Sequence, residues 1–153
     1  MKQAIVTGAS RGMGAGICQY LLAQGYRVLG LSRTSCAEGI QHIPVDFASP
    51  QQVEAVAKQI VKQLPAIDLI VCAAGIGYFG QLENLSLTGI QQVMDVNYTS
   101  HAALLSVLIP KMKQQKAGRV IAIGSESALQ GATQGGAYCA SKFALRGLLN
   151  TRQ

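Results

Sequence analysis

A tyrosine and a lysine stand four residues apart near the end of the sequence, within GGAYCASKFALRG. Residues four apart on a helix share one face, so Tyr138 and Lys142 are predicted to point into one site. A phenol normally has a pKa of about 10, and a nearby ammonium favours the phenolate form. Such a pair can pass a proton to or from a substrate oxygen. The spacing alone is common by chance, and its position after a predicted strand is what indicates a site.

Glycines gather near the other end of the sequence, in TGASRGMG at residues 7–14. Residues without a β-carbon at Gly8, Gly12 and Gly14 let the backbone bend tightly and approach a pyrophosphate, and the helix that follows offers free N–H groups. The spacing differs from GxGxxG, because three residues separate the first two glycines. A plain tight turn is the alternative. The position between the first strand and the first helix favours a dinucleotide site.

Both motifs need a scaffold, and the sequence alternates strands with helices. Apolar strands are predicted at 3–8, 27–32, 42–46, 67–75 and 118–125, and helices at 13–25, 50–64, 88–116 and from about residue 135. This alternation predicts a parallel sheet with right-handed crossovers. We therefore expect an α/β fold with a doubly wound, Rossmann-type sheet, in one domain that spans residues 1–153.

Composition excludes several classes of function. With 49% hydrophobic and 13% charged residues, the chain is not expected to be disordered. It shows neither a membrane-spanning run nor a signal peptide, so a cytoplasmic location and no membrane partner are expected. The four cysteines form no CxxC pair, so no metal site is expected. The net charge of +6 comes from scattered basic residues with few aromatic neighbours, and nucleic-acid binding is therefore not expected.

The glycine turn TGxxxGxG followed by a later YxxxK resembles the short-chain dehydrogenase/reductase family, from residue 1 to about residue 148. The resemblance implies an oxidoreductase that interconverts a small-molecule carbonyl and alcohol by hydride transfer, with Tyr138 as acid and base. Lys142 would also hold the nicotinamide ribose. Ser125, thirteen residues before the tyrosine, would steady the substrate oxygen, with Ser127 as second choice. Asn97 matches the family asparagine that holds a water in a proton relay.

The resemblance also implies NADP as the cofactor. Ser32 stands where an NAD enzyme has an acid, and Arg33 and Arg11 could pair with a 2′-phosphate. Two solvated surface arginines are the alternative. The implied cofactor-binding residues are Gly8, Ser10, Arg11, Gly12, Met13, Gly14, Arg33, Asp46, Phe47, Ala74, Gly75, Asn97, Tyr138 and Lys142. Asp46 and Phe47 would contact the adenine. Cys72–Gly75 replaces the family's Asn-Asn-Ala-Gly, which puts the bracing of the sheet there in doubt.

Family members continue with two further strands, so the sheet is expected to lack them and to leave the strand at 118–125 as an open edge. A truncated reading frame or a fragment is the simplest interpretation. The alternative function is a non-catalytic cofactor-binding remnant or a partner-dependent module. A homo-oligomer is expected by resemblance only. The sequence does not identify the substrate.

Overall fold

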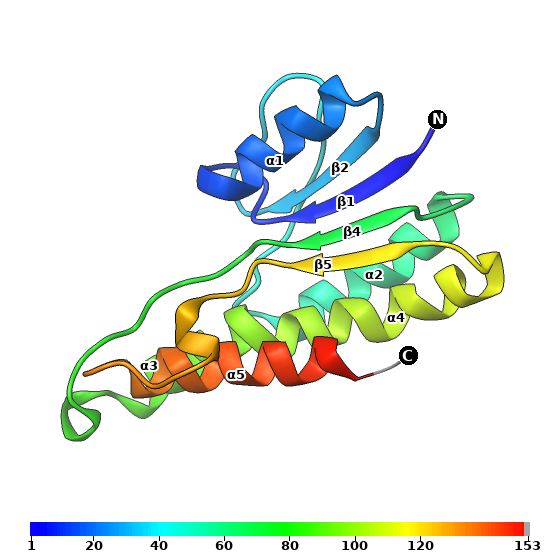
Figure 1. Ribbon diagram of the computed structural model, residues 1–153. Coiled ribbons are helices and arrows are strands. Elements are labelled where there is room, and N and C mark those ends of the chain that lie inside the picture. Colours follow the sequence, from blue (N-terminus) through cyan, green and yellow to red (C-terminus); the bar gives the residue numbers. More distant parts are fainter. Residues whose placement is uncertain (152–153) are drawn as a thin grey trace.

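Five parallel strands form one sheet in the computed structural model, which describes residues 1–151 (Figure 1). The strands are β1 (Gln3–Thr7), β2 (Arg27–Ser32), β3 (Gln41–Pro44), β4 (Leu69–Cys72) and β5 (Arg119–Ala122). Their spatial order is β3-β2-β1-β4-β5, and every neighbouring pair is parallel. The predicted Rossmann-type α/β fold is confirmed.

Within the described residues, four α-helices connect the strands and a fifth follows β5: α1 (Gly12–Ala23), α2 (Pro50–Gln63), α3 (Leu87–Met94), α4 (Ser100–Gln115) and α5 (Gly136–Asn150). The helix predicted at 88–116 is α3 and α4 joined by a π-helical turn, η2 (Asp95–Thr99). Single-turn 3-10 helices, η1 (Leu82–Asn84) and η3 (Glu126–Ala128), interrupt the loops that follow β4 and β5. A π-turn inside a helix often marks a functional position, and here it contains Asn97.

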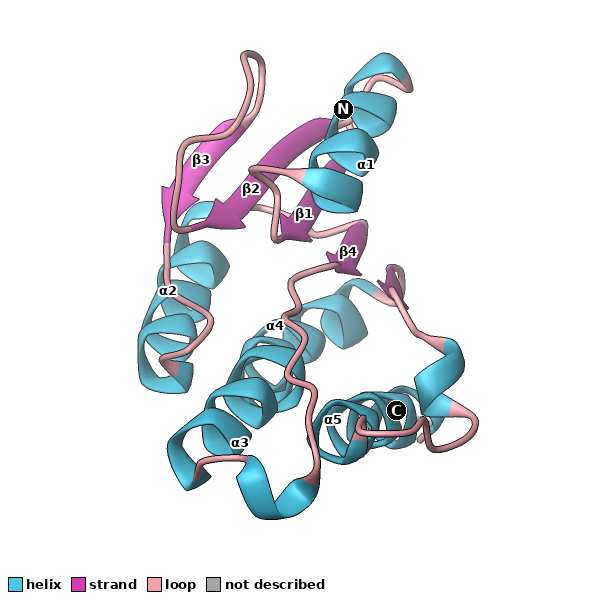
Figure 2. Cartoon of the chain, turned by 90° about the vertical axis from the view of Figure 1, so that its left-hand side faces the viewer, coloured by secondary structure: helices cyan, strands magenta, loops and turns pink. Residues whose placement is uncertain are grey.

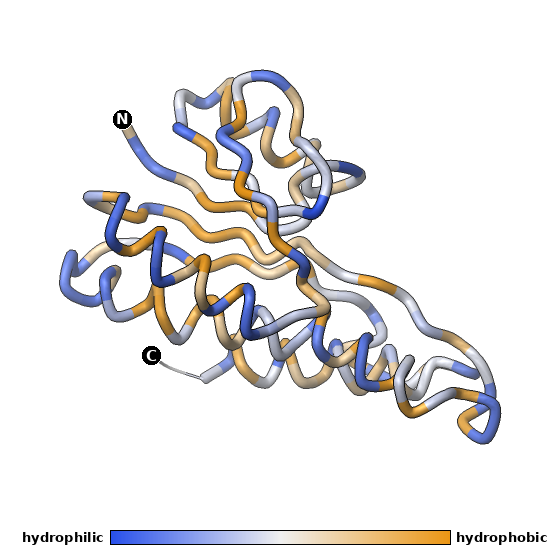
Figure 3. Tube along the Cα trace, turned by 180° about the vertical axis from the view of Figure 1, so that it is seen from behind, coloured by the Kyte–Doolittle hydropathy of each residue, from blue (hydrophilic) through white to orange (hydrophobic). Residues whose placement is uncertain are grey.

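The helices cover both faces of the sheet, with α1 on one face and α2, α4 and α5 on the other (Figures 1 and 2). Along β1, Ile5 packs into the core with α2 and α4, whereas Val6 packs toward α1. Side chains alternate in this way because successive residues of a strand point to opposite faces. The strands therefore form a continuous hydrophobic band between the helices, which Figure 3 shows in orange.

The direction of the chain across the sheet reverses between β1 and β4. From β1 the chain runs outward through β2 and β3, and it then returns to build β4 and β5 on the other side. In open α/β sheets ligands bind at such a switch point, beyond the carboxyl ends of the strands. The glycine turn after β1 and the segment after β4 meet at this place.

Strand β5 forms one edge of the sheet, as predicted. Ile121, in its middle, is 41% exposed, although the strand is mostly apolar. None of the helices in the described part of the chain combines the length and hydropathy needed to cross a bilayer.

Candidate active site

The glycine turn packs directly against the segment that follows β4. Gly8 has φ +67°, and a β-carbon there would lie 2.8 Å from the Cα of Ala74. A β-carbon on Gly14 would lie 2.1 Å from the carbonyl oxygen of Gly8. Both contacts involve backbone atoms that cannot give way, so both positions require glycine. The first turn of α1 is thereby drawn close to the ends of β1 and β4.

A cleft of about 430 Å3 lies over this turn. All the predicted cofactor-binding residues except Asn97, Tyr138 and Lys142 line it: Gly8, Ser10, Arg11, Gly12, Met13, Gly14, Arg33, Asp46, Phe47, Ala74 and Gly75. Further residues line the cleft that were not predicted to bind the cofactor, and three of them, Ile76, Gln92 and Val96, lie outside the segments of the sequence motifs. They come from the segment after β4 and from α3 and η2, where no motif singles out one residue.

Two arginines face the mouth of the cleft. Arg11 and Arg33 are exposed, and within residues 1–151 neither forms an ion pair with a carboxylate. Ser32, at the end of β2, contributes no charge, and its hydroxyl donates to the carbonyl of Thr34 at 2.8 Å. The carboxylate of Asp46 also lines the cleft and accepts from the N–H of Ala48. The two guanidinium groups against one carboxylate favour an anionic ligand.

Phe47 lines the cleft, but most of its ring belongs to the hydrophobic core. The residue is 6% exposed, and the ring centroid lies 5.2 Å from that of His101. Its carbonyl accepts a hydrogen bond from the Ser100 hydroxyl at 2.6 Å. Only a small part of Phe47 therefore faces the cleft.

Tyr138 and Lys142 share one face of α5, as their spacing predicts. Lys142 is 7% exposed, and its Nζ donates to the carbonyl of Ile123 at 3.3 Å. The same nitrogen lies 5.8 Å from the centroid of the Tyr138 ring. Burial lowers the pKa of Lys142 from its ordinary value of 10.5. Tyr138 is half-buried, and the ring of Phe79 covers it at 5.0 Å between centroids.

Gly75 joins the cleft to this pair. It lines the cleft, and a β-carbon on it would lie 3.6 Å from Nζ of Lys142 and 3.5 Å from Oδ1 of Asn97. The backbone at Gly75 therefore separates the cleft from the buried amine by the width of one small group. Lys142 and Asn97, which do not line the cleft, are thus brought to its border.

Asn97 is fully buried in the π-turn, and its side chain connects two segments. Its Oδ1 accepts from the N–H of Ile76 at 2.8 Å, and its Nδ2 donates to the carbonyl of Ile76 and to Oγ of Ser141, both at 2.9 Å. The Ser141 hydroxyl in turn donates to the carbonyl of Tyr138. Both amide hydrogens are therefore used within the protein, and the water relay at Asn97 stays a prediction.

Ser125 precedes η3 as its N-cap residue and lines a different cavity. Its Oγ accepts from the N–H of Ser127 at 3.1 Å, and both serines are half-buried. Ser125 and Lys142 both line a cavity of about 310 Å3 between η3 and α5. Ser125 and Lys142 thus border the same cavity.

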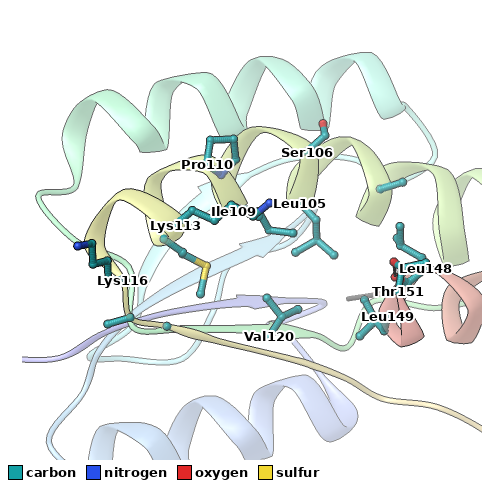
Figure 4. A pocket seen from close by; sticks show the side chains of 14 residues that line it. Leu105, Ser106, Ile109, Pro110, Lys113, Lys116, Val120, Leu148, Leu149 and Thr151 are labelled. Carbon is teal, nitrogen blue, oxygen red and sulfur yellow. Dashed lines mark hydrogen bonds between the residues drawn. The ribbon is translucent and has the colours of Figure 1, made fainter. Parts of the chain in front are cut away.

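A larger cavity lies away from these residues. It measures about 810 Å3 and lies between α4, β5 and the end of α5 (Figure 4). Its walls are mostly apolar, with Leu105, Ile109, Val120 and Leu149 around it. None of the predicted site residues lines this cavity.

The family asparagines that would brace the sheet after β4 are replaced in Cys72–Gly75. The structure shows that Oγ1 of Thr7 accepts from the N–H groups of Ala73 and Ala74, each at 2.9 Å. Nε2 of His101 lies 3.0 Å from the same oxygen. Thr7 belongs to the quoted glycine motif, but no spacing links it to His101, which is 94 residues away. In residues 1–151, no three His, Cys, Asp or Glu side chains are grouped to hold a metal.

Comparisons with known proteins agree with this geometry. The family model "short chain dehydrogenase" matches residues 2–153. The human 17-beta-hydroxysteroid dehydrogenase type 1 is 30% identical over 94% of this chain and 49% of its own length. Aldohexose dehydrogenase of Thermoplasma acidophilum superimposes with a TM-score of 0.88 at 32% identity, over 96% of this chain and 58% of the other.

A metagenomic short-chain oxidoreductase, solved in complex with NADP, gives a TM-score of 0.88 at 30% identity, over 96% of this chain and 72% of the other. The chain spans about half the length of the curated relatives that it matches first. The family model and the identity over nearly the whole chain establish that it belongs to the short-chain dehydrogenases.

Proposed function

We propose that this chain binds NADP(H) in the cleft over the glycine turn and interconverts a carbonyl and an alcohol. The observation that carries the proposal is the position of Gly75, which lines the cleft and borders the Lys142 amine. A dinucleotide cleft and a candidate proton-transfer pair therefore adjoin each other. The nicotinamide would supply or accept the hydride.

The residues present fit such a cofactor. A β-carbon on Gly8 would collide with the backbone of Ala74 after β4, and one on Gly14 with the carbonyl of Gly8, so the turn stays narrow enough for a pyrophosphate to approach its backbone. The first turn of α1 offers its free N–H groups to a pyrophosphate. Arg11 and Arg33 would pair with the 2′-phosphate of NADP, and the neutral Ser32 would not repel it. Asp46 and the exposed part of Phe47 would border the adenine.

In the direction of reduction, Tyr138 would donate its phenolic proton to the substrate oxygen as hydride reaches the carbonyl carbon. The C=O double bond becomes a C–O single bond, and the phenolate that remains is stabilised by the Lys142 ammonium beside its ring. Ser125 would donate a second hydrogen bond to the same oxygen. Oxidation of an alcohol is the reverse of these steps.

The substrate is proposed only as a carbonyl or alcohol of a small molecule. One relative is named for a hydroxysteroid and one solved neighbour for an aldohexose, and the chemistry that these names share is the carbonyl–alcohol pair. The chain spans about half the length of these relatives, and the substrate is therefore named only by this pair.

A second candidate function is cofactor binding without turnover. The open edge at β5 and the cavity of about 810 Å3 beside it favour this alternative. Both leave apolar surface exposed next to α5, as expected for a module that depends on a partner. Titration with NADPH combined with a panel of ketones distinguishes the two. Binding without NADPH oxidation would favour the second candidate.

The choice of cofactor is tested at Arg33. The Arg33→Asp variant should bind NADH more tightly than NADPH, reversing the preference of the unchanged chain, because a carboxylate repels the 2′-phosphate. Arg27 is a matched control, since it is exposed at the opposite end of β2. Arg27→Asp should leave the preference unchanged. An Arg33→Asp variant that still prefers NADPH would contradict the assignment.

We also propose that the chain forms a homo-oligomer, on the basis of its family alone. Members of this family commonly pair through the long helix and the helix that carries the tyrosine and lysine, here α4 and α5. Sedimentation equilibrium tests this proposal, because a monomer at all concentrations would exclude it.

A further inference from the structure

We infer that His101 is a positioning residue: as a neutral imidazole with its proton on Nδ1, it orients the Thr7 hydroxyl so that this oxygen holds the wall of the cleft. The cleft wall is the backbone of Ala73 and Ala74. The consequence for cofactor binding rests on the proposed function, whereas the protonation state of His101 does not.

The hydrogen bonds at Thr7 determine where its proton lies. Oγ1 is 2.9 Å from the N–H of Ala73, 2.9 Å from the N–H of Ala74 and 3.0 Å from Nε2 of His101. A backbone N–H can only donate, and a hydroxyl oxygen has two lone pairs and one proton. The two amides occupy both lone pairs. The hydroxyl proton is therefore left for His101, and Nε2 must accept it.

The second nitrogen of His101 is then defined as well. A neutral imidazole whose Nε2 accepts carries its proton on Nδ1. Nδ1 lies 3.3 Å from the carbonyl oxygen of Asn97, which can only accept. The two contacts of the ring are thus satisfied by one tautomer, and an imidazolium would direct a proton at an oxygen with no free lone pair.

The surroundings of His101 favour the same neutral state. The side chain is completely buried, with the Phe47 ring 5.2 Å away between centroids. The pKa of His101 is lowered to about 4, mainly by burial; the hydrogen bond to the Asn97 carbonyl opposes this shift, and the positive charge of Lys142 adds to it. Lys142 is the charged group that acts on the ring, and it comes from α5.

The position of Thr7 explains why its orientation matters. It is the last residue of β1 and precedes Gly8, while Ala73 and Ala74 follow the end of β4. The hydroxyl therefore spans the two strand ends at the switch point of the sheet. Cys72, Ala73 and Ala74 bring no side-chain donor or acceptor comparable to an amide. The two backbone N–H groups depend on the Thr7 oxygen, and this oxygen depends on His101 for its orientation.

The same histidine extends the connection to the helix with the candidate catalytic pair. Its Nδ1–H holds the carbonyl of Asn97, whose side chain binds the backbone of Ile76 and Oγ of Ser141. Ser141 lies one residue before Lys142 and donates to the carbonyl of Tyr138. His101 thus links the cleft wall to α5 through hydrogen bonds, without touching the cleft itself.

The tautomer can be measured directly by two-bond 15N–1H correlation on the labelled chain. The chain has two histidines, and His42 serves as an internal control. Nε2 of His42 lies 3.0 Å from the carbonyl of Ser32, so this nitrogen must carry a proton. At neutral pH we expect the Nδ1–H tautomer for His101 and a protonated Nε2 for His42, assigned with His42→Gln. A protonated Nε2 on His101 would overturn the inference.

The effect on the cleft wall is measured at Thr7. Thr7→Val keeps the shape but removes the hydroxyl, and it should speed amide hydrogen exchange at Ala73 and Ala74 by about ten-fold or more. Thr7→Ser keeps the hydroxyl and should retain the protection. In Thr7→Val the fixed Nδ1–H tautomer of His101 should be lost, and NADPH binding should weaken by about ten-fold.

Unchanged exchange at Ala73 and Ala74 in Thr7→Val would overturn the inference. If Thr7→Val does not fold, the inference is still tested by the tautomer of His101 in the unaltered chain and by amide exchange at Ala73 and Ala74 in Thr7→Ser. If the tautomer and the exchange are as expected but NADPH does not bind, the proposed function fails and the role of His101 stands.

Discussion

The Lys142 ammonium nitrogen lies 5.8 Å from the centroid of the Tyr138 ring while donating a hydrogen bond to the carbonyl of Ile123. The bond to Ile123, the residue directly after β5, fixes the amine relative to the sheet. The neighbouring positions on α5 fix the phenol relative to the amine. The Lys142 amine is therefore held both by α5 and by the segment directly after β5.

We predict that Lys142→Met lowers the rate of NADPH-dependent carbonyl reduction by about 100-fold or more, because the charge that stabilises a phenolate is removed at similar volume. Steady-state kinetics with a ketone measures the effect. Lys111→Met is the matched control, since the Nζ of Lys111 also donates to a backbone carbonyl, that of Val61. Equal losses in the two variants would indicate a general structural effect and contradict the role of Lys142.

A substitution at Gly14 in the glycine turn should change both the stability of the chain and cofactor binding. Gly14→Ala should abolish cofactor binding and destabilise the chain, because its β-carbon would lie 2.1 Å from the Gly8 carbonyl oxygen. Gly16 lies in the same helix, with no atom within 4 Å of an added β-carbon. Gly16→Ala should stabilise the chain by about 0.5–1 kcal/mol and leave binding unchanged. Urea denaturation and NADPH titration test both. Normal NADPH binding in Gly14→Ala would contradict the close packing of Gly14 against the Gly8 carbonyl.

We predict an acid-sensitive contribution to stability from His101. Its pKa is about 4 in the folded chain and about 6.5 when unfolded, so the unfolded state binds the proton more readily between these values. The stabilisation is present above pH 6.5 and is lost as the pH falls toward 4. The shift corresponds to about 3 kcal/mol. Urea denaturation at several pH values should show this slope in the unaltered chain.

The His101→Gln variant provides the comparison. It should be less stable at neutral pH but lose less stability on acidification, because no imidazole is left to titrate at this position. The same pH dependence in both chains would assign the slope to other groups.

The ring of Phe79 lies 5.0 Å from that of Tyr138 and is 59% exposed, so it forms a wall beside the candidate catalytic phenol. Phe79→Ala should raise KM for aromatic ketones by several-fold, consistent with the energy of an aromatic pair, without changing the Kd of NADPH. Tyr20→Ala, at an exposed aromatic position on α1, is the control. If the Phe79→Ala variant keeps the KM of the unaltered chain, Phe79 does not contact the substrate.

The sequence predicted the order of elements well, because strand–helix alternation and buried apolar runs leave few topologies. It did not reveal the π-turn at Asp95–Thr99. A single extra residue in one turn barely disturbs the 3.6-residue apolar period by which a helix is recognised in a sequence. The structure places Asn97 within that turn, where its side chain binds Ile76.

Local motifs likewise located the cleft but not its support. The glycines and arginines are recognisable because their chemistry depends on spacing along the chain. His101 is a single histidine in an apolar helix, and its partner Thr7 is distant in sequence. The hydrogen bond between them exists only after β1 and α4 are packed together, so no pattern in the sequence predicts it.

The central claim is that Tyr138 transfers the proton beside a cofactor held by the glycine turn. It is tested most directly by following NADPH oxidation with a panel of ketones in the unaltered chain and in Tyr138→Phe, with NADPH affinity measured in both. We expect equal affinities and a rate at least about 100-fold lower in Tyr138→Phe. Equal rates in the two chains would contradict the account.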